Sequence, residues 1–196
     1  MPDAASTQDL KAELRRTALA KRDALPAPDR AAAADAIAAR IFPVPIPSDA
    51  VVSGYSPMKS ELNPVPLMRI LANFGAQLAL PVVQGRGKPL IMRGWTFGAP
   101  LASGVWGIRE PTADAPEVFP DIMLVPLAAF DRAGQRIGYG AGYYDMTIAR
   151  IRAMKPAIAI GLAFAAQEVE SIPAEPHDAP LDLVLTEHDV IDFRRQ

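Results

Sequence analysis

Short apolar runs alternate with helical segments along this chain of 196 residues, and that alternation limits its possible folds more than any other feature. We expect strands at residues 50–55, 77–83, 89–95, 121–130, 157–164 and 181–187. Most segments between these strands have the residue spacing of helices. Strands that are connected through helices usually pair in parallel. The chain is therefore predicted to be an α/β protein: one three-layer, Rossmann-like domain over residues 1–196, with a mostly parallel sheet and helices on both faces.

Capping residues locate the expected helices. Ser6 followed by Asp9 predicts a helix start, which leaves residues 1–6 as an expected flexible end, and prolines at 26 and 28 interrupt that helix. An alanine-rich segment, residues 29–42, predicts a second helix. Asn63 and Pro64 predict an N-cap and a first-turn proline, and Gly75 predicts the stop. The side of this third helix expected to face the core carries Leu67, Ile70, Leu71 and Phe74. A fourth helix is expected over residues 142–154.

Composition limits the partners. The formal net charge is −2, which argues against broad binding to nucleic acid or anionic membranes. Cysteine is absent, so the chain has no disulfide, thiolate nucleophile or Cys-ligated zinc. The longest apolar stretch, residues 156–167, is too short to cross a bilayer and predicts a buried strand. We expect a soluble cytoplasmic protein without a secretion signal, as a monomer, with a homodimer as the alternative.

In sheets of this type, ligands bind beyond the carboxyl ends of the strands. The loops that follow those ends are residues 56–61, 84–88, 131–145 and 165–178. We therefore expect the chemistry of the protein in these loops.

The third of these loops contains RIGYGAGYYD, residues 136–145, with glycines at 138, 140 and 142 before a predicted helix. Backbone N–H groups at such a helix start attract anions, and missing Cβ atoms allow close approach. Tyr143 stands where a dinucleotide fingerprint has its third glycine, and no Walker A sequence follows. Local spacing leaves two interpretations, a phosphate loop and a glycine-rich hairpin or helix cap.

Lys11, Arg15 and Arg22 fall on one face of the first predicted helix. Spacing alone favours a solvated basic face. The alternative is a phosphate clamp, with arginine bidentate and lysine as a mobile charge.

Several carboxylates and aromatic side chains lie in or next to the same loops. Asp145 either interacts with the helix dipole or, with a second carboxylate, holds Mg²⁺. Candidates for that second carboxylate are Glu175, Asp178 and Asp182, for which turn and strand-entry roles are the alternatives. His177 is interpreted as solvent-facing, and Glu61 is interpreted as surface charge or, alternatively, a ligand for an amine-bearing group. The aromatic residues predict either core packing or a slot for a flat heterocycle: Trp106, Tyr143 and Tyr144.

Six blocks in order resemble the 5-formyltetrahydrofolate cyclo-ligase family, also called methenyltetrahydrofolate synthetase. They are KAELR with a later Arg22, GYSPMKSE, GIREP, DIMLVPLAAFDRAGQRIGYGAGYYD, GLAFAAQ and PHDAPLDLVLTE. The resemblance covers nearly the whole chain, and its longest block is the most specific.

The resemblance implies an enzyme that closes 5-formyltetrahydrofolate to 5,10-methenyltetrahydrofolate with ATP and Mg²⁺, without a protein nucleophile or other catalytic side chain. Carried over by motif, Asp145 and Asp178 would bind Mg²⁺. Glu61 would bind folate, together with the loop residues Tyr139, Gly140, Ala141, Gly142 and Tyr143. The ATP-binding residues would be Lys11, Arg15, Arg136, Ile137, Gly138, Tyr139, Gly140, Ala141, Gly142, Tyr143 and Tyr144.

The sequence departs from the family pattern at two positions. Ala141 stands where many members have Gly or Lys, and Met146 stands where many bacterial members have Arg. Neither is a proposed metal ligand. The alternatives are a non-catalytic folate- or nucleotide-binding relative and a sugar-phosphate isomerase or acyl-transferase on a similar sheet, for which Glu61 is the one clear base.

Overall fold

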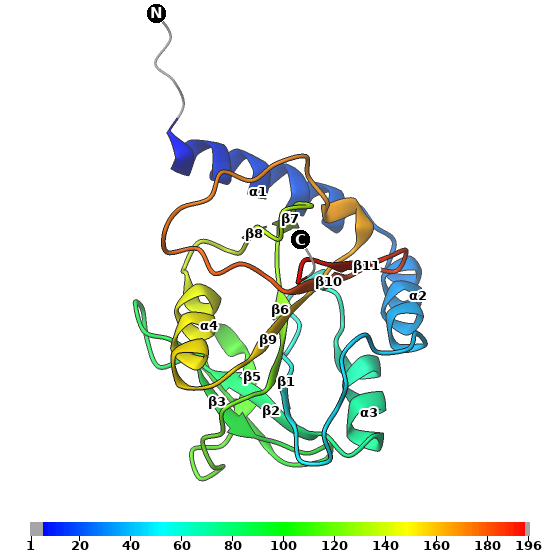
Figure 1. Ribbon diagram of the computed structural model, residues 1–196, viewed down its shortest axis with the longest axis vertical. Helices are drawn as coiled ribbons and strands as arrows, with labels where there is room; N and C mark the ends of the chain where they lie inside the picture. Colours follow the sequence, from blue (N-terminus) through cyan, green and yellow to red (C-terminus); the bar gives the residue numbers. More distant parts are fainter. Residues whose placement is uncertain (1–5, 195–196) are drawn as a thin grey trace, which may run out of the picture.

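A seven-stranded sheet forms the centre of the computed structural model, which describes residues 6–194 (Figure 1). The strand order is β11-β10-β9-β6-β1-β2-β3. The four inner pairings are parallel, and the two edge strands β3 and β11 run antiparallel to their neighbours. The mostly parallel α/β prediction is confirmed. The strands are β1 (Val51–Ser53), β2 (Gln77–Val82), β3 (Ile91–Gly94), β6 (Ile122–Pro126), β9 (Ile158–Leu162), β10 (Leu183–Leu185) and β11 (Val190–Asp192).

Helices cover both faces of the sheet, as predicted. On one face, α2 (Ala27–Ala38) and α3 (Val65–Asn73) pack on a core that includes Leu124 of β6. On the other face, α4 (Tyr143–Met154) packs on Met123 and Val125 of the same strand. Successive side chains of a strand point to opposite faces, so β6 contributes to both cores.

The first helix, α1 (Thr7–Asp23), covers neither face of the sheet. It crosses above the carboxyl ends of the inner strands (Figure 1), where it contacts β7 (Ala129–Phe130) and the 3₁₀ turn η2 (Ala165–Gln167). Ser6 is its N-cap and forms a reciprocal capping box with Asp9, which confirms the predicted start. The expectation of flexibility for residues 1–6 lies, apart from Ser6, outside the described residues.

Two short antiparallel pairs complete the fold. One pair joins β7 to β8 (Arg136–Ile137), directly before the glycine loop. The other joins β4 (Leu101–Ser103) to β5 (Arg109–Pro111) around the turn η1 (Val105–Gly107). The predicted strand over residues 121–130 is thus two strands, β6 and β7, and only β6 belongs to the main sheet.

Three helix predictions need correction. The N-cap of α3 is Pro64 instead of Asn63, whose side-chain oxygen accepts from the Val65 N–H just inside the helix. On α3, Leu67 and Leu71 are buried as expected, but Ile70 is 37% exposed and Phe74 is 68% exposed. Phe74 follows the end of the helix, so helical spacing no longer sets its direction; the predicted stop at Gly75 is confirmed by its φ of +95°. The second helix begins at Ala27 instead of residue 29, because proline fits the first turn of a helix.

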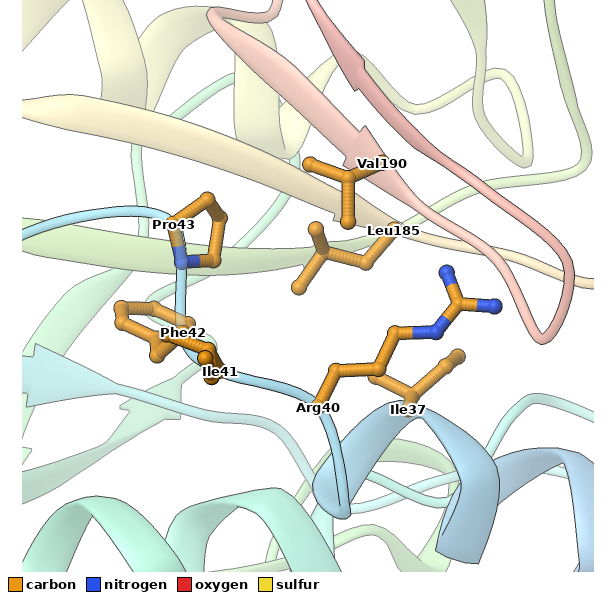
Figure 2. A pocket seen from close by; sticks show the side chains of 7 residues that line it. All are labelled: Ile37, Arg40, Ile41, Phe42, Pro43, Leu185 and Val190. Atoms are coloured by element: carbon orange, nitrogen blue, oxygen red, sulfur yellow. The ribbon is translucent and has the colours of Figure 1, made fainter.

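No helix among residues 6–194 is long and apolar enough to cross a membrane. A hollow of about 10 Å³ lies between the end of α2 and the strands β10 and β11 (Figure 2). Its lining is apolar except for Arg40, whose guanidinium donates to the Glu187 carbonyl oxygen. A space of this size holds about one water molecule, so we assign it to packing.

Candidate active site at the carboxyl edge

The glycine loop, residues 138–142, leads from β8 into the first turn of α4. Gly140 and Gly142 have φ angles of +97° and +68°, and Gly142 is the N-cap of α4. Among the described residues, no hydrogen bond is donated by the backbone N–H groups of residues 138–142. The loop therefore presents unsatisfied donors at the positive end of a helix.

The basic face of α1 points into this region. Lys11 is 7% exposed and Arg22 is 1% exposed, so the interpretation as a solvated face is wrong. Arg15 Nε donates to the Gly138 carbonyl oxygen at 2.7 Å, which ties α1 to the glycine loop. Spacing along one helix could not reveal this burial, because the partners of Lys11 and Arg22 come from loops between 38 and 167 residues away.

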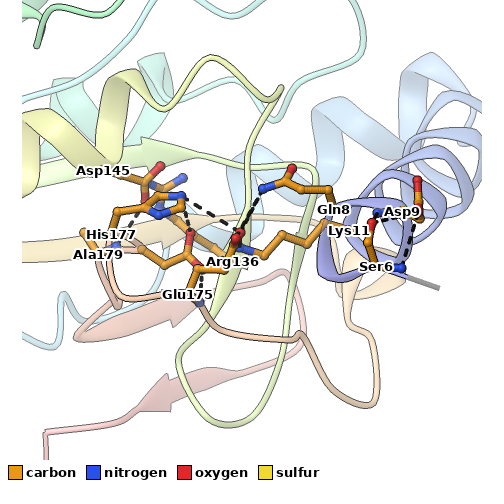
Figure 3. A network of polar contacts seen from close by, with 10 residues as sticks. Ser6, Gln8, Asp9, Lys11, Arg136, Asp145, Glu175, His177 and Ala179 are labelled. Carbon is orange, nitrogen blue, oxygen red and sulfur yellow. Dashed lines mark hydrogen bonds and ion pairs between the residues drawn. The ribbon is translucent and has the colours of Figure 1, made fainter. Parts of the chain in front are cut away.

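Lys11 is held by two carboxylates of the loop before β10 (Figure 3). Its Nζ lies 2.7 Å from Glu175 Oε2 and 2.6 Å from Asp178 Oδ2. Burial lowers the pKa of Lys11, but hydrogen bonds and charges from the two carboxylates outweigh it and raise that pKa above 10.5. The Lys11 ammonium lowers the pKa of Glu175, and it lowers that of Asp178 against the opposing effect of burial.

Asp145, in the first turn of α4, faces the same loop. Its Oδ1 accepts from Arg136 Nη2 at 2.7 Å and from the Ala179 N–H at 3.1 Å. Asp145 and Asp178 consequently line one cavity of about 590 Å³. The cavity is also lined by Gly87, Ala141, Gly142 and Met146.

The donor set in this cavity fits a hard divalent cation. Asp145 Oδ2 and Asp178 Oδ1 make no hydrogen bond within residues 6–194, and the exposed His177 Nε2 lies 3.8 Å from Asp178 Oδ1, so each carboxylate keeps one oxygen available to a cation. Carboxylate oxygens are preferred ligands of Mg²⁺. Ligand atoms of Glu175, His177 and Asp178 also lie within 4.8 Å of one another. His177 is solvent-facing, as interpreted from the sequence, with its side chain 69% exposed.

Glu61 is buried, at 8% exposed, so its interpretation as surface charge is wrong. Its Oε2 accepts from the Met58 N–H at 2.7 Å, and the Tyr139 hydroxyl lies beside the same carboxyl group. Burial raises the pKa of Glu61, although both of these groups and the charge of Arg22 oppose the rise. Burial and the Glu61 charge raise the pKa of Tyr139 to about 12.

Aromatic side chains lie beside this carboxylate. Tyr144 is half-buried, and its buried hydroxyl has no hydrogen-bond partner within the described part of the chain, as is also true of the buried Arg136 Nε. Burial and the Glu61 charge raise the pKa of Tyr144. The ring of Tyr143 lies 6.1 Å from that of Trp106, which is 69% exposed. Buried orphan donors next to a cavity are typical of a site completed by a ligand.

The glycine loop lines one cavity together with Asp145 and Asp178, and α1 is linked to it through the Lys11–Asp178 and Arg15–Gly138 contacts. The sequence profile of the 5-formyltetrahydrofolate cyclo-ligase family matches residues 7–187. The chain belongs to this family. A Mycolicibacterium smegmatis 5-formyltetrahydrofolate cyclo-ligase is 34% identical over 187 residues, which is 90% of this chain and 93% of the relative. The Escherichia coli K12 protein of that name is 34% identical over 131 residues, 64% of this chain and 71% of its own length.

A solved structure agrees with the family assignment. The NMR structure of Aquifex aeolicus 5,10-methenyltetrahydrofolate synthetase superposes with a TM-score of 0.76 at 30% identity. The match covers 94% of this chain and 93% of that protein. The cyclo-ligase fold thus extends over nearly the whole chain.

The structure connects predicted site residues through direct contacts: Lys11 with Asp178, Arg15 with Gly138, and Arg136 with Asp145. Arg22, already a candidate on the basic face, bonds to Ser60, which sequence reasoning missed, and Gly87 lines the cavity. The sequence did indicate the loop of Gly87, because residues 84–88 follow the carboxyl end of a predicted strand. Ser60 gave no signal, because a lone serine in a polar loop has no distinguishing pattern.

Proposed function

We propose that this protein is an ATP-dependent 5-formyltetrahydrofolate cyclo-ligase that releases 5,10-methenyltetrahydrofolate, ADP and phosphate. The observation that carries the proposal is the cavity in which the glycine loop and the N-terminus of α4 meet Asp145 and Asp178. Unbonded N–H groups and three nearby cations suit a polyphosphate, and the buried Glu61 suits the amine-bearing edge of a pterin.

The chemistry needs positioning more than a protein nucleophile. In the first step, the formyl oxygen attacks the γ-phosphorus of ATP, and the bond to the β-phosphate oxygen breaks to release ADP. In the second step, folate N10 attacks the formyl carbon, loses its proton, and phosphate leaves with the former formyl oxygen. Phosphorylation thereby turns a poor leaving group into a good one, and charge neutralisation is the main task of the protein.

Each group of this chain has a part in that task. Lys11, Arg15 and Arg136 would neutralise the phosphates, while the N–H groups of residues 138–142 would bind their oxygens. Asp145 and Asp178 would hold Mg²⁺ through their available oxygens, and the ion would supply charge stabilisation at the transferring phosphate. Glu61 would orient the folate so that its formyl oxygen faces the γ-phosphate.

The contacts of the ligand-free chain imply one rearrangement and, among the described residues, leave Arg136 Nε unpartnered. Lys11 has to leave Asp178 and Glu175, at least in part, before it contacts a phosphate. Arg136 is paired with Asp145, so its unpartnered Nε is the group most available to a ligand. Met146, where many bacterial relatives have Arg, supplies no cation at its own position; Arg152 of the same helix lines the cavity and is paired with Asp182.

The test is a turnover assay that follows methenyl-folate absorbance with 5-formyltetrahydrofolate, ATP and Mg²⁺. The expected result is one ADP for each methenyl-folate formed, and no product when ATP is omitted or replaced by a non-hydrolysable analogue. Absence of product from folded wild-type protein would refute the enzyme proposal. Calorimetric binding of 5-formyltetrahydrofolate or ATP by that inactive protein would then favour the non-catalytic relative.

A further inference from the structure

Arg22 is among the most buried large side chains of the molecule, at 1% exposed near the end of α1. A buried guanidinium needs partners, because an unpaired buried charge is strongly destabilising. The nearest carboxylate oxygen, Asp23 Oδ1, lies 3.6 Å away, beyond hydrogen-bond distance. Arg22 instead donates from Nε to Ser60 Oγ at 2.9 Å and from Nη1 to Tyr139 Oη at 2.7 Å.

These two bonds join loops that carry different substrates in the proposed function. Tyr139 belongs to the glycine loop, and Ser60 directly precedes the buried Glu61. Ser60 Oγ in turn donates to Asp23 Oδ1, so two neighbouring residues of α1, Arg22 and Asp23, hold Ser60. The guanidinium thus sets the distance between the phosphate loop and the residue proposed to bind folate.

Arg22 also decides which way the Tyr139 hydroxyl points. A phenol has one proton, and its oxygen accepts from Arg22 Nη1. Its proton is therefore directed away from the guanidinium, and the Glu61 carboxyl group is the partner beside it. Arg22 therefore bonds to Tyr139, whose hydroxyl lies beside Glu61, and bonds to Ser60, the residue directly before Glu61.

We propose that Arg22 is a positioning residue for folate: through Tyr139 and Ser60 it holds the Glu61 carboxylate in one orientation toward the substrate. The inference rests on the proposed function, since it assigns Glu61 to the folate. Lysine is a poor substitute, because two guanidinium nitrogens in a rigid plane reach two hydroxyls at once, whereas an ammonium is a point charge on a flexible stem.

The first test compares Arg22→Lys, Tyr139→Phe and the double variant, with KM measured separately for 5-formyltetrahydrofolate and ATP. We expect Arg22→Lys to raise the folate KM about tenfold or more, the scale of a hydrogen bond to a charged group, with the ATP KM within about threefold. The double variant should raise the folate KM by less than the product of the two single effects, because Arg22 and Tyr139 share one contact and only the Ser60 contact of Arg22 is independent of Tyr139. Arg16→Lys is the matched control, since Arg16 is exposed on the same helix and pairs only with Glu13 among the described residues.

The outcomes separate this inference from the proposed function. Equal changes in both KM values, an unchanged folate KM, or additive effects in the double variant would overturn the positioning role. An inactive wild type would instead refute the proposed function. If Arg22→Lys does not fold, Ser60→Ala and Tyr139→Phe test the proposal instead, because each removes one acceptor of Arg22. Each variant must then raise the KM for folate more than the KM for ATP.

A second readout is the pH profile of kcat/KM for folate. The titratable and charged groups that face Glu61 are Arg22 from α1, Tyr139 from the glycine loop, Tyr55 after β1 and Tyr144 from α4. Arg22 is the cation in this set. Its removal in Arg22→Met should raise the pKa of Glu61 and move the acidic limb to higher pH, whereas Arg22→Lys should leave that limb in place. A limb that does not move in folded Arg22→Met would contradict the link between Arg22 and Glu61.

Discussion

At the scale of single residues, Asp145 is the clearest test of the metal assignment. Asp145→Asn keeps an oxygen for the Ala179 N–H but removes the charge that attracts Mg²⁺ and pairs with Arg136. We expect turnover to fall about 100-fold or more, since charge stabilisation by a metal is worth several kcal/mol and about 1.4 kcal/mol corresponds to tenfold. The measurement is methenyl-folate formation over a Mg²⁺ titration.

Asp35→Asn is the matched control for that variant, because Asp35 is exposed on α2. Both variants should melt within a few degrees of the wild type. Wild-type turnover and Mg²⁺ dependence in Asp145→Asn would show that the metal assignment is wrong.

Glu61 separates folate binding from phosphate chemistry. Glu61→Gln has nearly the same shape but is neutral, so it mimics the protonated carboxyl group that burial favours. We expect the folate KM to rise about 10- to 100-fold, as for loss of a hydrogen bond to a charged group, with little change in the ATP KM. Steady-state kinetics with each substrate varied in turn measures both. An unchanged folate KM would leave Glu61 with a structural role only.

At the scale of elements, the sequence predicted where helices and strands lie better than which side chains they bury. The capping pair Ser6 and Asp9 and the stop at Gly75 depend on neighbours a few residues away, and both are confirmed. The burial of Lys11, Arg22 and Glu61 depends on partners that only the fold brings close. Charge alone predicted exposure at these positions, and it failed because Lys11 and Arg22 have hydrogen-bonding partners far along the chain, while Glu61 accepts from the Met58 N–H of its own loop.

The glycine loop allows a prediction about the start of α4. Gly142 adopts φ +68°, and a Cβ placed there would meet no atom within 4 Å, so the cost of Gly142→Ala is backbone strain without a clash. We expect a loss of about 1–2 kcal/mol in the free energy of unfolding, which is a fall in Tm of a few degrees for a chain of this size. Thermal melts of the ligand-free protein measure it.

Gly142→Asn is the control for that variant, because asparagine tolerates the left-handed region better than alanine. Its Tm should fall between those of Gly142→Ala and the wild type. Equal melting of Gly142→Ala and the wild type would mean that the loop does not need its left-handed N-cap.

At the scale of the whole molecule, the two ends of the sheet have different tasks. The carboxyl end collects the buried charges of the site, whereas carboxylates at the amino end fix strand entries. Asp182 Oδ2 accepts from the Ala159 N–H at the start of β9, and Asp121 Oδ2 accepts from the Val51 N–H at the start of β1. The sequence indicated a strand-entry role as one alternative for Asp182, but it offered no means of telling such carboxylates from metal ligands, because both precede or follow strands.

Asp121 makes the division between the two ends testable through pH. Burial raises its pKa, but the hydrogen bonds from Lys155, 2.5 Å away, and from Val51 outweigh that effect and lower it below 3.8. The stability that ionised Asp121 contributes is therefore present above pH 3.8 and lost as the pH falls through the lowered pKa.

Asp121→Asn should cost up to about 1 kcal/mol at pH 7, a modest value because the pair is about one-third exposed, and almost nothing at about pH 2. Denaturant unfolding at both pH values measures the difference, with Asp35→Asn as the exposed control. Because Asp121 lies at the amino end, catalytic turnover at pH 7 should stay at the wild-type level; a loss of turnover, or an equal stability loss at both pH values, would contradict this division of the sheet.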